Sequence, residues 1–489
     1  MRDVVQLVRN GPSALFFEQS LDSRLISKLL FSILLTGAAQ SHAQSPLNQY
    51  LDEAMMRNPA LSAAGQDVEA ERQRLDNLRA RYYPSLSLSA RISVSEGGRT
   101  IDFPAGTLLN PVYQTLNAQA VAMGQPARFP TVQNQSIPLL RPTEQDTRLQ
   151  LRGPLYEPVL NQQVQAQKEA LNAQEAARQQ VREELTRDLQ VAYWQMAQSQ
   201  ARIDVLKASQ KALQENRRVN DALYKSGETT LDAPKRALAE LLDVEVQLSD
   251  AIKQRKLAQE LFNTLRFVTV DSPVELPDET LQDNTLQALT DLLRPSETEA
   301  RSAPEITRLQ RSLAAQTAAL GAAQATYKPS LGYLIEGGYQ GRDYSTGPNT
   351  GFATASVVMN WTLADGGVRN SEASRARAQL NALAARAAQV SRQLLLARSQ
   401  ARENLLVSLN AIPARKAQQD AAQESLRIVT RKRDAGEATQ IEFLSSEQAA
   451  TRARLALSAA VHQARIDHAI WQYHNRDIPE LQALQGVAP

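Results

Sequence analysis

Hydrophobic residues along this chain follow two patterns, short stretches with a period of two and long stretches with a period of three to four. Residues 85–95 show the first pattern, because apolar side chains occupy every second position between Ser and Arg residues. Successive side chains of a strand point to opposite faces, so this strand has one apolar and one polar face. Its length of about ten residues suits a tilted strand that crosses an outer membrane. An edge strand of a soluble sandwich is the alternative.

Three further strands are expected from the same pattern. One lies at about residues 145–154, where Leu149 and Leu151 alternate with polar residues, and another at about 330–341. The last is expected at about 352–363. One face of that strand carries Ala353, Ala355, Val357, Met359, Trp361 and Leu363. The first strand is placed at about 85–96, and the connection from 97 to 144 is a long loop rich in Pro, Gly and Gln.

The second pattern predicts two very long helices, from about Pro158 to Lys225 and from about Gly367 to Arg433. Spacings of four and three residues mark a heptad seam, which is typical of helices wound side by side. The first seam contains Leu185, Leu189, Ala192, Met196, Ser199, Ile203, Leu206, Gln210 and Leu213, and the second contains Leu383, Ala387, Val390, Leu394, Ala397 and Ala401. A helix of this length spans roughly 100 Å. Pro413 is expected to kink or break the second helix.

Each long helix ends at a glycine, Gly227 or Gly436, that can adopt the left-handed conformation of a helix terminus. A shorter helix then returns, from Ala233 to Leu265 and from Phe443 to about Tyr473. Asp232 can act as an N-cap before the proline of the first return helix. We call these two glycine-containing segments, residues 225–232 and 434–442, the tip turns.

The chain contains an internal repeat. Pro59 and Pro84 are 25 positions apart, and so are Pro304 and Pro329, with a polar, Ala-rich segment between the members of each pair. Each repeat reads as helix, strand, strand, long helix, tip turn and return helix. One chain therefore supplies only four strands, whereas a transmembrane barrel needs eight or more to close. A barrel built from these strands must belong to an oligomer.

The N-terminal region reads as a secretory signal peptide at residues 1–43. Lys28 precedes a short apolar run, and small residues at Ser41 and Ala43 suit cleavage after Ala43. The remaining division is a first repeat at 44–267, a linker or small accessory segment at 268–300, a second repeat at 301–475 and a tail at 476–489.

The composition and motifs of the chain argue against an enzyme active site and against a cofactor or metal site. There is no cysteine, the formal net charge is +2, and the four histidines lack a metal-binding spacing. No nucleophile and base arrangement or phosphate loop is present. We therefore expect no enzyme activity, no cofactor, no metal site and no nucleic-acid partner.

The ordered set of motifs resembles the TolC family of outer-membrane channel proteins over about residues 46–475. The resemblance rests on the duplicated proline pairs, on the Tyr-Xaa-Pro-Ser-Leu motifs before the first strand of each repeat, and on the two tip glycines. It also rests on Gly153-Pro154-Leu155-Tyr156, which enters the first long helix. The fold implied is mainly α with a small β part. It is a duplicated unit whose long helices form a periplasmic α-barrel and whose four strands join a shared trimeric β-barrel.

The same resemblance implies function and partners. The chain would be the passive outer-membrane duct of a tripartite efflux or type I secretion system in a Gram-negative bacterium. It would act as a homotrimer in outer-membrane lipid, with a periplasmic adaptor and an inner-membrane transporter. Drug, metal, protein toxin and polysaccharide exporters share this duct, so the cargo stays open. A structural periplasmic coiled coil or adaptor without a channel is the alternative function.

Candidate site residues fall into three groups. The adaptor is expected to contact the tip turns at Gly227, Asp232, Gly436 and Glu442. The barrel lumen is expected to contain Arg91, Arg148 and Arg152, and lipid is expected to contact Leu86, Leu88, Ile92, Val94 and Trp361. Glu442 has two readings, either an acidic ring around a three-fold axis or an acid that favours the start of its own helix.

Overall fold

The computed structural model describes residues 46–277, 283–295, 302–343 and 350–478. The predicted signal peptide at 1–43 lies outside the described residues, and so does most of the predicted tail at 476–489. The described residues from Tyr50 onward belong to one compact unit.

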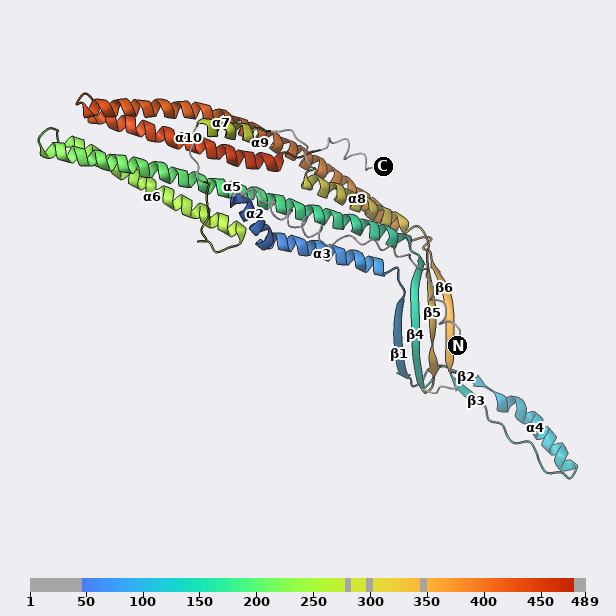
Figure 1. Cartoon of the computed structure of the whole chain (residues 1–489). Coiled ribbons are helices and arrows are strands. Elements are labelled where there is room, and N and C mark those ends of the chain that lie inside the picture. Colours follow the sequence, from blue (N-terminus) through green and yellow to red (C-terminus); the bar gives the residue numbers. More distant parts are fainter. Residues whose placement is uncertain (1–45, 278–282, 296–301, 344–349, 479–489) are drawn as a thin grey trace, which may run out of the picture. The chain divides into compact units, whose positions relative to one another are not determined.

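The helices and strands expected from the sequence occur in the expected order, with further elements between them (Figure 1). The helices are α2 (Pro46–Arg57), α3 (Pro59–Ala80), α4 (Ala105–Ala122), α5 (Pro158–Lys225), α6 (Asp232–Arg266), α7 (Asp283–Leu293), α8 (Pro304–Ala325), α9 (Val368–Asp434) and α10 (Gln440–His474). The strands are β1 (Ser85–Val94), β2 (Thr100–Phe103), β3 (Gln135–Pro138), β4 (Thr143–Tyr156), β5 (Ser330–Gly341) and β6 (Gly351–Asn360). The predicted class, mainly α with a small β part, is confirmed.

The duplication is visible in the lengths of equivalent elements. α3 and α8 both have 22 residues, α5 and α9 have 68 and 67, and α6 and α10 both have 35. Each repeat places two strands of the four-stranded sheet between its short helix and its long helix, and the first repeat adds β2, α4 and β3 between those two strands. The two halves are therefore copies of one helix, strand, strand, helix, helix unit.

Four of the strands form one antiparallel sheet in the order β1-β4-β5-β6. The hairpin of each repeat contributes two neighbouring strands, and β4 pairs with β5 to join the repeats. Within the described residues, β1 and β6 are the open edges of this sheet. An open edge presents unpaired N–H and C=O groups, so another strand can pair with it.

The register gives the sheet an apolar and a polar face. Leu86 pairs with Leu151, Leu88 with Leu149, and Ile335 lies opposite both Leu151 and Ala355, so apolar residues of all four strands share a face. That face also includes Ala90, Ile92, Val94, Ala353, Val357 and Met359. Arg91, Asp146, Arg148, Gln150, Arg152, Glu336, Thr354 and Ser356 share the opposite face.

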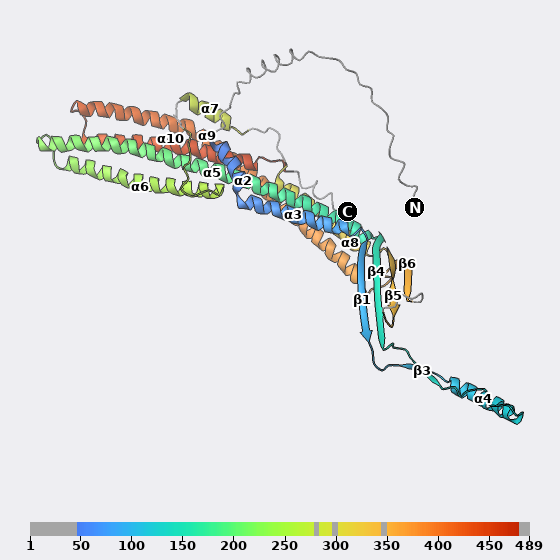
Figure 2. The same ribbon diagram turned by 60° about the horizontal axis from the view of Figure 1, so that its bottom comes forward.

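The long helices pack as pairs, α5 with α6 and α9 with α10, and α5 also packs against α3, α8 and α10. Figures 1 and 2 show α6 side by side with the part of α5 that leads to the first tip turn, and α10 side by side with the corresponding part of α9. Seven of the nine residues of the first predicted seam are buried in the described chain, namely Leu185, Leu189, Ala192, Met196, Ile203, Leu206 and Leu213. Burying one leucine of this kind stabilises a fold by about 1.5–3 kcal/mol. Among the described helices, none combines the length and the apolar character needed to cross a membrane.

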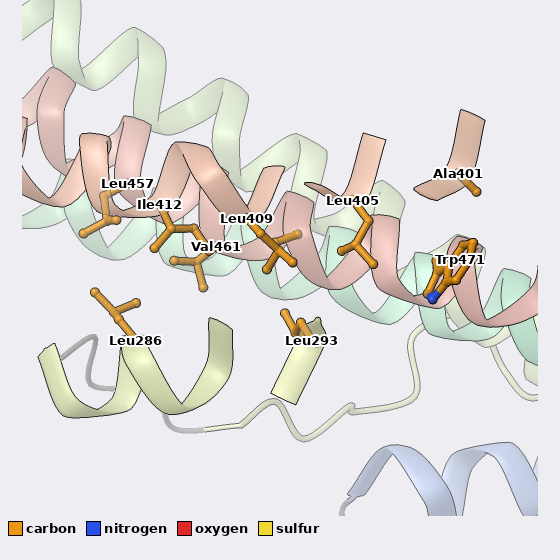
Figure 3. Packing of buried hydrophobic residues seen from close by; sticks show 10 residues of the cluster. Leu286, Leu293, Ala401, Leu405, Leu409, Ile412, Leu457, Val461 and Trp471 are labelled. Carbon is orange, nitrogen blue, oxygen red and sulfur yellow. The ribbon is translucent and has the colours of Figure 1, made fainter. Parts of the chain in front are cut away.

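The structure corrects the sequence analysis at Pro413 and adds detail to the segment at 268–300. The sequence predicts a kink or a break at Pro413, and the break is wrong because α9 continues through this proline. The segment expected as a linker at 268–300 contains α7, and Leu286 and Leu293 of α7 pack on a buried cluster formed by α9 and α10 (Figure 3). That cluster contains Ala401, Leu405, Leu409, Ile412, Leu457, Val461, Ala464 and Trp471. This packing explains why an otherwise polar segment is helical there.

The connection from β1 to β4 was predicted as a long loop, and it instead contains β2, α4 and β3. β2 and β3 pair as a short antiparallel ribbon, with Ile101 opposite Ile137. α4 has good helix formers such as Ala, Leu and Gln, but Pro104 before it and Gly124 after it gave the segment the composition of a loop.

Candidate functional site

The apolar row of β1 is open to its surroundings in the described chain. Leu86, Leu88, Ile92 and Val94 are 64%, 72%, 67% and 81% exposed. A soluble protein rarely exposes such a continuous row, whereas the outer face of a membrane barrel consists of such residues. The row therefore has the geometry that contact with lipid requires.

The opposite face of the sheet carries a charged network. Arg148 on β4 forms an ion pair with Asp146 on the same strand and lies 3.6 Å from Glu336 on β5. The side-chain amide of Gln150 donates a 2.9 Å hydrogen bond to Glu336. Arg91 on β1 lies directly opposite Asp146 in the register. Arg91, Arg148 and Arg152 thus share a face with two carboxylates that balance part of their charge.

Sequence reasoning missed these two carboxylates. Asp146 and Glu336 occupy the same alternation as the arginines within their strands, so their positions could have been read from the period of two. What the sequence could not give is the register between β4 and β5, which places Glu336 opposite Gln150.

Trp361 does not belong to a strand, and that prediction is corrected. β6 ends at Asn360, which pairs with Ser330, the first residue of β5, so no partner strand remains for Trp361. Its indole nitrogen instead donates a 3.1 Å hydrogen bond to the backbone oxygen of Tyr327, between α8 and β5. The side chain remains 53% exposed.

The two tip turns share one backbone geometry. Gly227 has φ of 80° and Gly436 has φ of 79°, which confirms the left-handed conformation predicted for both. The N–H of Glu228 donates to the carbonyl of Leu223 over 2.9 Å, and the N–H of Glu437 donates to that of Lys432 over 2.7 Å. These bonds, together with those from the glycine N–H groups, form a Schellman motif in each tip turn.

The helices that follow the tip turns begin differently. α10 starts with a capping box, in which Thr439 accepts a 3.2 Å bond from the N–H of Glu442 and the Glu442 carboxylate accepts a 2.7 Å bond from the N–H of Thr439. α6 has no side-chain cap, and its N-cap residue is Leu231. Asp232 is therefore not the N-cap that the sequence suggested. Its carboxylate accepts a hydrogen bond from Thr230 and lies 3.5 Å from Arg236.

Both tip acids are held in the charged form. Hydrogen bonds from the backbone and then the hydroxyl of Thr439 lower the pKa of Glu442. The hydroxyl of Thr230 is the main cause that lowers the pKa of Asp232, and Arg236 contributes less. The position equivalent to Glu442 in the first tip turn, six residues after the glycine, is Ala233. The two turns of one chain thus present different side chains at their helix starts.

Some contacts between the two helical hairpins, α5–α6 and α9–α10, lie close to the tip turns. Arg433 at the end of α9 donates a 3.2 Å hydrogen bond to the amide oxygen of Asn216 on α5. The same guanidinium lies 4.0 Å from the ring centroid of Phe443, which is buried among α5, α6 and α10 side chains. Arg433 therefore connects the second tip turn to the first hairpin, and nothing in its local sequence pattern indicated this role.

Comparisons with known proteins agree with this geometry. Residues 296–469 match the family model described as outer membrane efflux protein. The outer-membrane channel OprN has the same fold with a TM-score of 0.70 and 18% identity, over 89% of this chain and 91% of OprN. VceC from Vibrio cholerae gives 0.69 and 18%, over 88% of this chain and 97% of VceC. The Neisseria gonorrhoeae channel MtrE, in its open state, gives 0.68 and 17%, over 89% and 91%. No curated protein matches the sequence.

The shared fold confirms the architecture that the resemblance to TolC-family channels predicts, and the family match covers most of the second repeat. Residues 296–469 thus resemble the outer membrane efflux protein family, and the described chain shares the fold of solved outer-membrane channels.

Proposed function

We propose that the chain is the outer-membrane duct of a tripartite export system, of either the efflux or the type I secretion kind. Three copies form the channel, a periplasmic adaptor docks on the helical tips, and an inner-membrane transporter supplies the energy. The observation that carries this proposal is the pair of exposed tip turns, which share a rigid Schellman geometry although they lie in different repeats.

Tip turns of this kind suit adaptor docking. Glu228 and Glu437 are exposed next to the glycines, and a backbone fixed by two hydrogen bonds in each turn presents them in a defined position. In a trimer the two turns of each chain supply six such points around the axis. Asp232 and Glu442 follow directly on the return helices and complete this acidic rim.

The sheet faces support the remaining assignments. We assign Leu86, Leu88, Ile92 and Val94 to the lipid side, because the exposed row is continuous across the register with apolar residues of β4. Arg91, Arg148 and Arg152 are then assigned to the lumen, where water can solvate charge. Glu442 is assigned to a ring of three carboxylates at the periplasmic aperture, in addition to its capping role.

Photocrosslinking in living cells tests the docking proposal. A photoreactive residue replaces Glu228 or Glu437 at the tips, and Lys253, exposed on α6 away from the turn, provides the matched control. Crosslinks to a periplasmic adaptor at the tip positions and none at Lys253 are expected. An outer-membrane trimer without tip crosslinks would contradict docking, and a chain that stays monomeric outside the membrane would favour the structural coiled-coil alternative.

A further inference from the structure

α4 exposes an apolar stripe. In the second repeat only residues 342–350 separate β5 from β6, too few for a helix of this length. The 18 residues of α4 contain no charged side chain. The stripe consists of Leu108, Leu109, Val112, Leu116 and Met123, which are between 37% and 71% exposed. An apolar helix surface of this size needs a partner.

The other side of α4 is covered by the segment that returns from Gly124 to β3. Asn110 exchanges two 2.8 Å hydrogen bonds with the backbone of Val132, and Asn117 does the same with the backbone of Phe129 over 2.8 and 3.0 Å. The ring of Tyr113 stacks on that of Phe129 at 5.2 Å. These contacts fix the rotation of α4, so the stripe points away from its own chain.

The stripe has the spacing of a coiled-coil seam. Leu109, Val112, Leu116, Gln119 and Met123 follow one another at intervals of three, four, three and four residues. Such intervals place side chains along one seam of a helix that packs against like helices, and a single polar residue in the seam fixes their register. Pro111 lies outside the seam and leaves it intact.

The position of α4 in the fold favours a second copy of this chain as the partner. α4 lies between β1 and β4, at the strand ends away from α3 and α5, which is the outer side of a channel with periplasmic helices. β1 is the open edge that a neighbouring subunit completes. The α4 segments of neighbouring subunits therefore emerge next to a shared interface. A lipid surface is a poorer partner, because helices that lie on membranes use Lys and Arg on their polar face and α4 has neither.

We propose that the three α4 helices of the trimer pack together through Leu109, Val112, Leu116 and Met123, and form a three-helix bundle outside the barrel. This inference rests on the trimeric assembly of the proposed function. The bundle would lie over the outer opening and narrow it, because all three helices are tied to the rim by the β2–β3 ribbons.

Cysteine crosslinking in the full-length protein tests the bundle, since the natural sequence contains no cysteine. Val112→Cys places a thiol in the seam, and Gln114→Cys places one on an exposed position of the same helix outside it. Oxidation of outer-membrane fractions should give disulfide-linked dimers for Val112→Cys and none for Gln114→Cys. Adding Leu109→Gln and Leu116→Gln to Val112→Cys should abolish the link while the trimer persists on unheated gels.

The same gels separate the possible failures. An intact trimer in which Val112→Cys does not crosslink would overturn the bundle and leave the channel assignment standing. Labelling of the Val112→Cys thiol by a bilayer-restricted reagent would overturn it in favour of lipid. Loss of the trimer in the wild type would contradict the proposed function and the bundle together.

Discussion

The hydroxyl of Ser209 on α5 donates a 2.6 Å hydrogen bond to the carboxylate of Glu447 on α10, across 238 positions of sequence. Both side chains are buried, with 1% and 3% of their surfaces exposed, and Thr451 donates a second bond of 2.9 Å to the same oxygen. A buried carboxylate must be hydrogen-bonded to be tolerated. The pair thus joins the two helical hairpins of one chain at a buried, closely packed position.

Removing the Ser209 hydroxyl should weaken the packing of α5 against α10. Ser209→Ala is expected to destabilise this contact by about 1.5–3 kcal/mol, the range for a hydrogen bond to a charged group. The measurement is hydrogen exchange of the α5 and α10 amides. Ser199→Ala is the matched control, because that hydroxyl bonds only to its own helix at Gln195 among the described contacts. Equal amide protection in the Ser209→Ala and Ser199→Ala variants would show that the hydrogen bond between Ser209 and Glu447 does not stabilise the protein.

Substitutions on the two faces of β1 should have opposite outcomes. Ile92→Arg should block trimer assembly, because an arginine on the lipid side costs about 2–4 kcal/mol near the bilayer midplane. Arg91→Ala, one residue away on the other face, should leave the trimer intact. Heat-modifiable migration of outer-membrane fractions on gels measures both. A lipid-restricted label that reaches position 91 rather than 92 would show that the faces are assigned the wrong way round.

The tip glycines should be needed for docking rather than for folding. A Cβ at Gly436 would meet no atom within 4 Å, so the cost of Gly436→Val is conformational, about 1–2 kcal/mol for a left-handed residue. That cost falls on the turn alone, so the trimer should form while export is lost. Ala435→Val is the control, since Ala435 has φ of −86°, which any residue adopts. Normal export by the Gly436→Val variant would show that the second tip turn only connects α9 to α10 and is not needed for docking.

Glu442 should contribute to cation selectivity of the aperture. Glu442→Gln is expected to leave the trimer intact, to reduce cation selectivity and to weaken block by divalent cations in single-channel recordings, because three carboxylates around an axis attract cations. Thr439→Ala should cost about 1 kcal/mol at the start of α10 and leave the charge in place. Unchanged selectivity and block in Glu442→Gln would leave this residue with its capping role only.

The capping box also predicts a pH dependence. The pKa of Glu442 is lowered in the folded chain from its ordinary value of 4.5. The stabilisation is therefore present above that ordinary value and is lost as the pH falls through the lower folded pKa. Amide protection at the start of α10 should drop over that acidic window in the wild type and not in Glu442→Gln. Crowding of three carboxylates would instead raise the pKa, so a loss beginning above the ordinary value would favour a tight ring.

The elements predicted well were those with a regular period of hydrophobic residues. The ends of α5 agree with the predicted Pro158 and Lys225, because a heptad seam continues without interruption between a proline and a glycine that mark them. The faces of β1 followed from strict alternation. Both features are local, so they can be read from neighbouring residues.

The errors arose where tertiary packing decided the outcome. Pro413 stays within α9, where its neighbours Leu409 and Ile412 pack in the cluster with α10 and α7. Trp361 continued the alternation of β6 but lies beyond the end of its partner strand. The approach of Glu336 to Arg148 depended on the register between β4 and β5. None of these features is specified by residues adjacent in sequence.

The unpaired edges β1 and β6 have a consequence for the order of biogenesis. A single chain that entered the bilayer alone would carry two rows of backbone groups into hydrocarbon without hydrogen-bond partners, and each such group costs several kcal/mol. In the trimer proposed above, insertion therefore has to wait until three chains have met. The rate at which channels appear should rise more steeply than in proportion to the amount of exported chain, and a cell that makes this protein slowly would accumulate unassembled chains in the periplasm rather than partial pores.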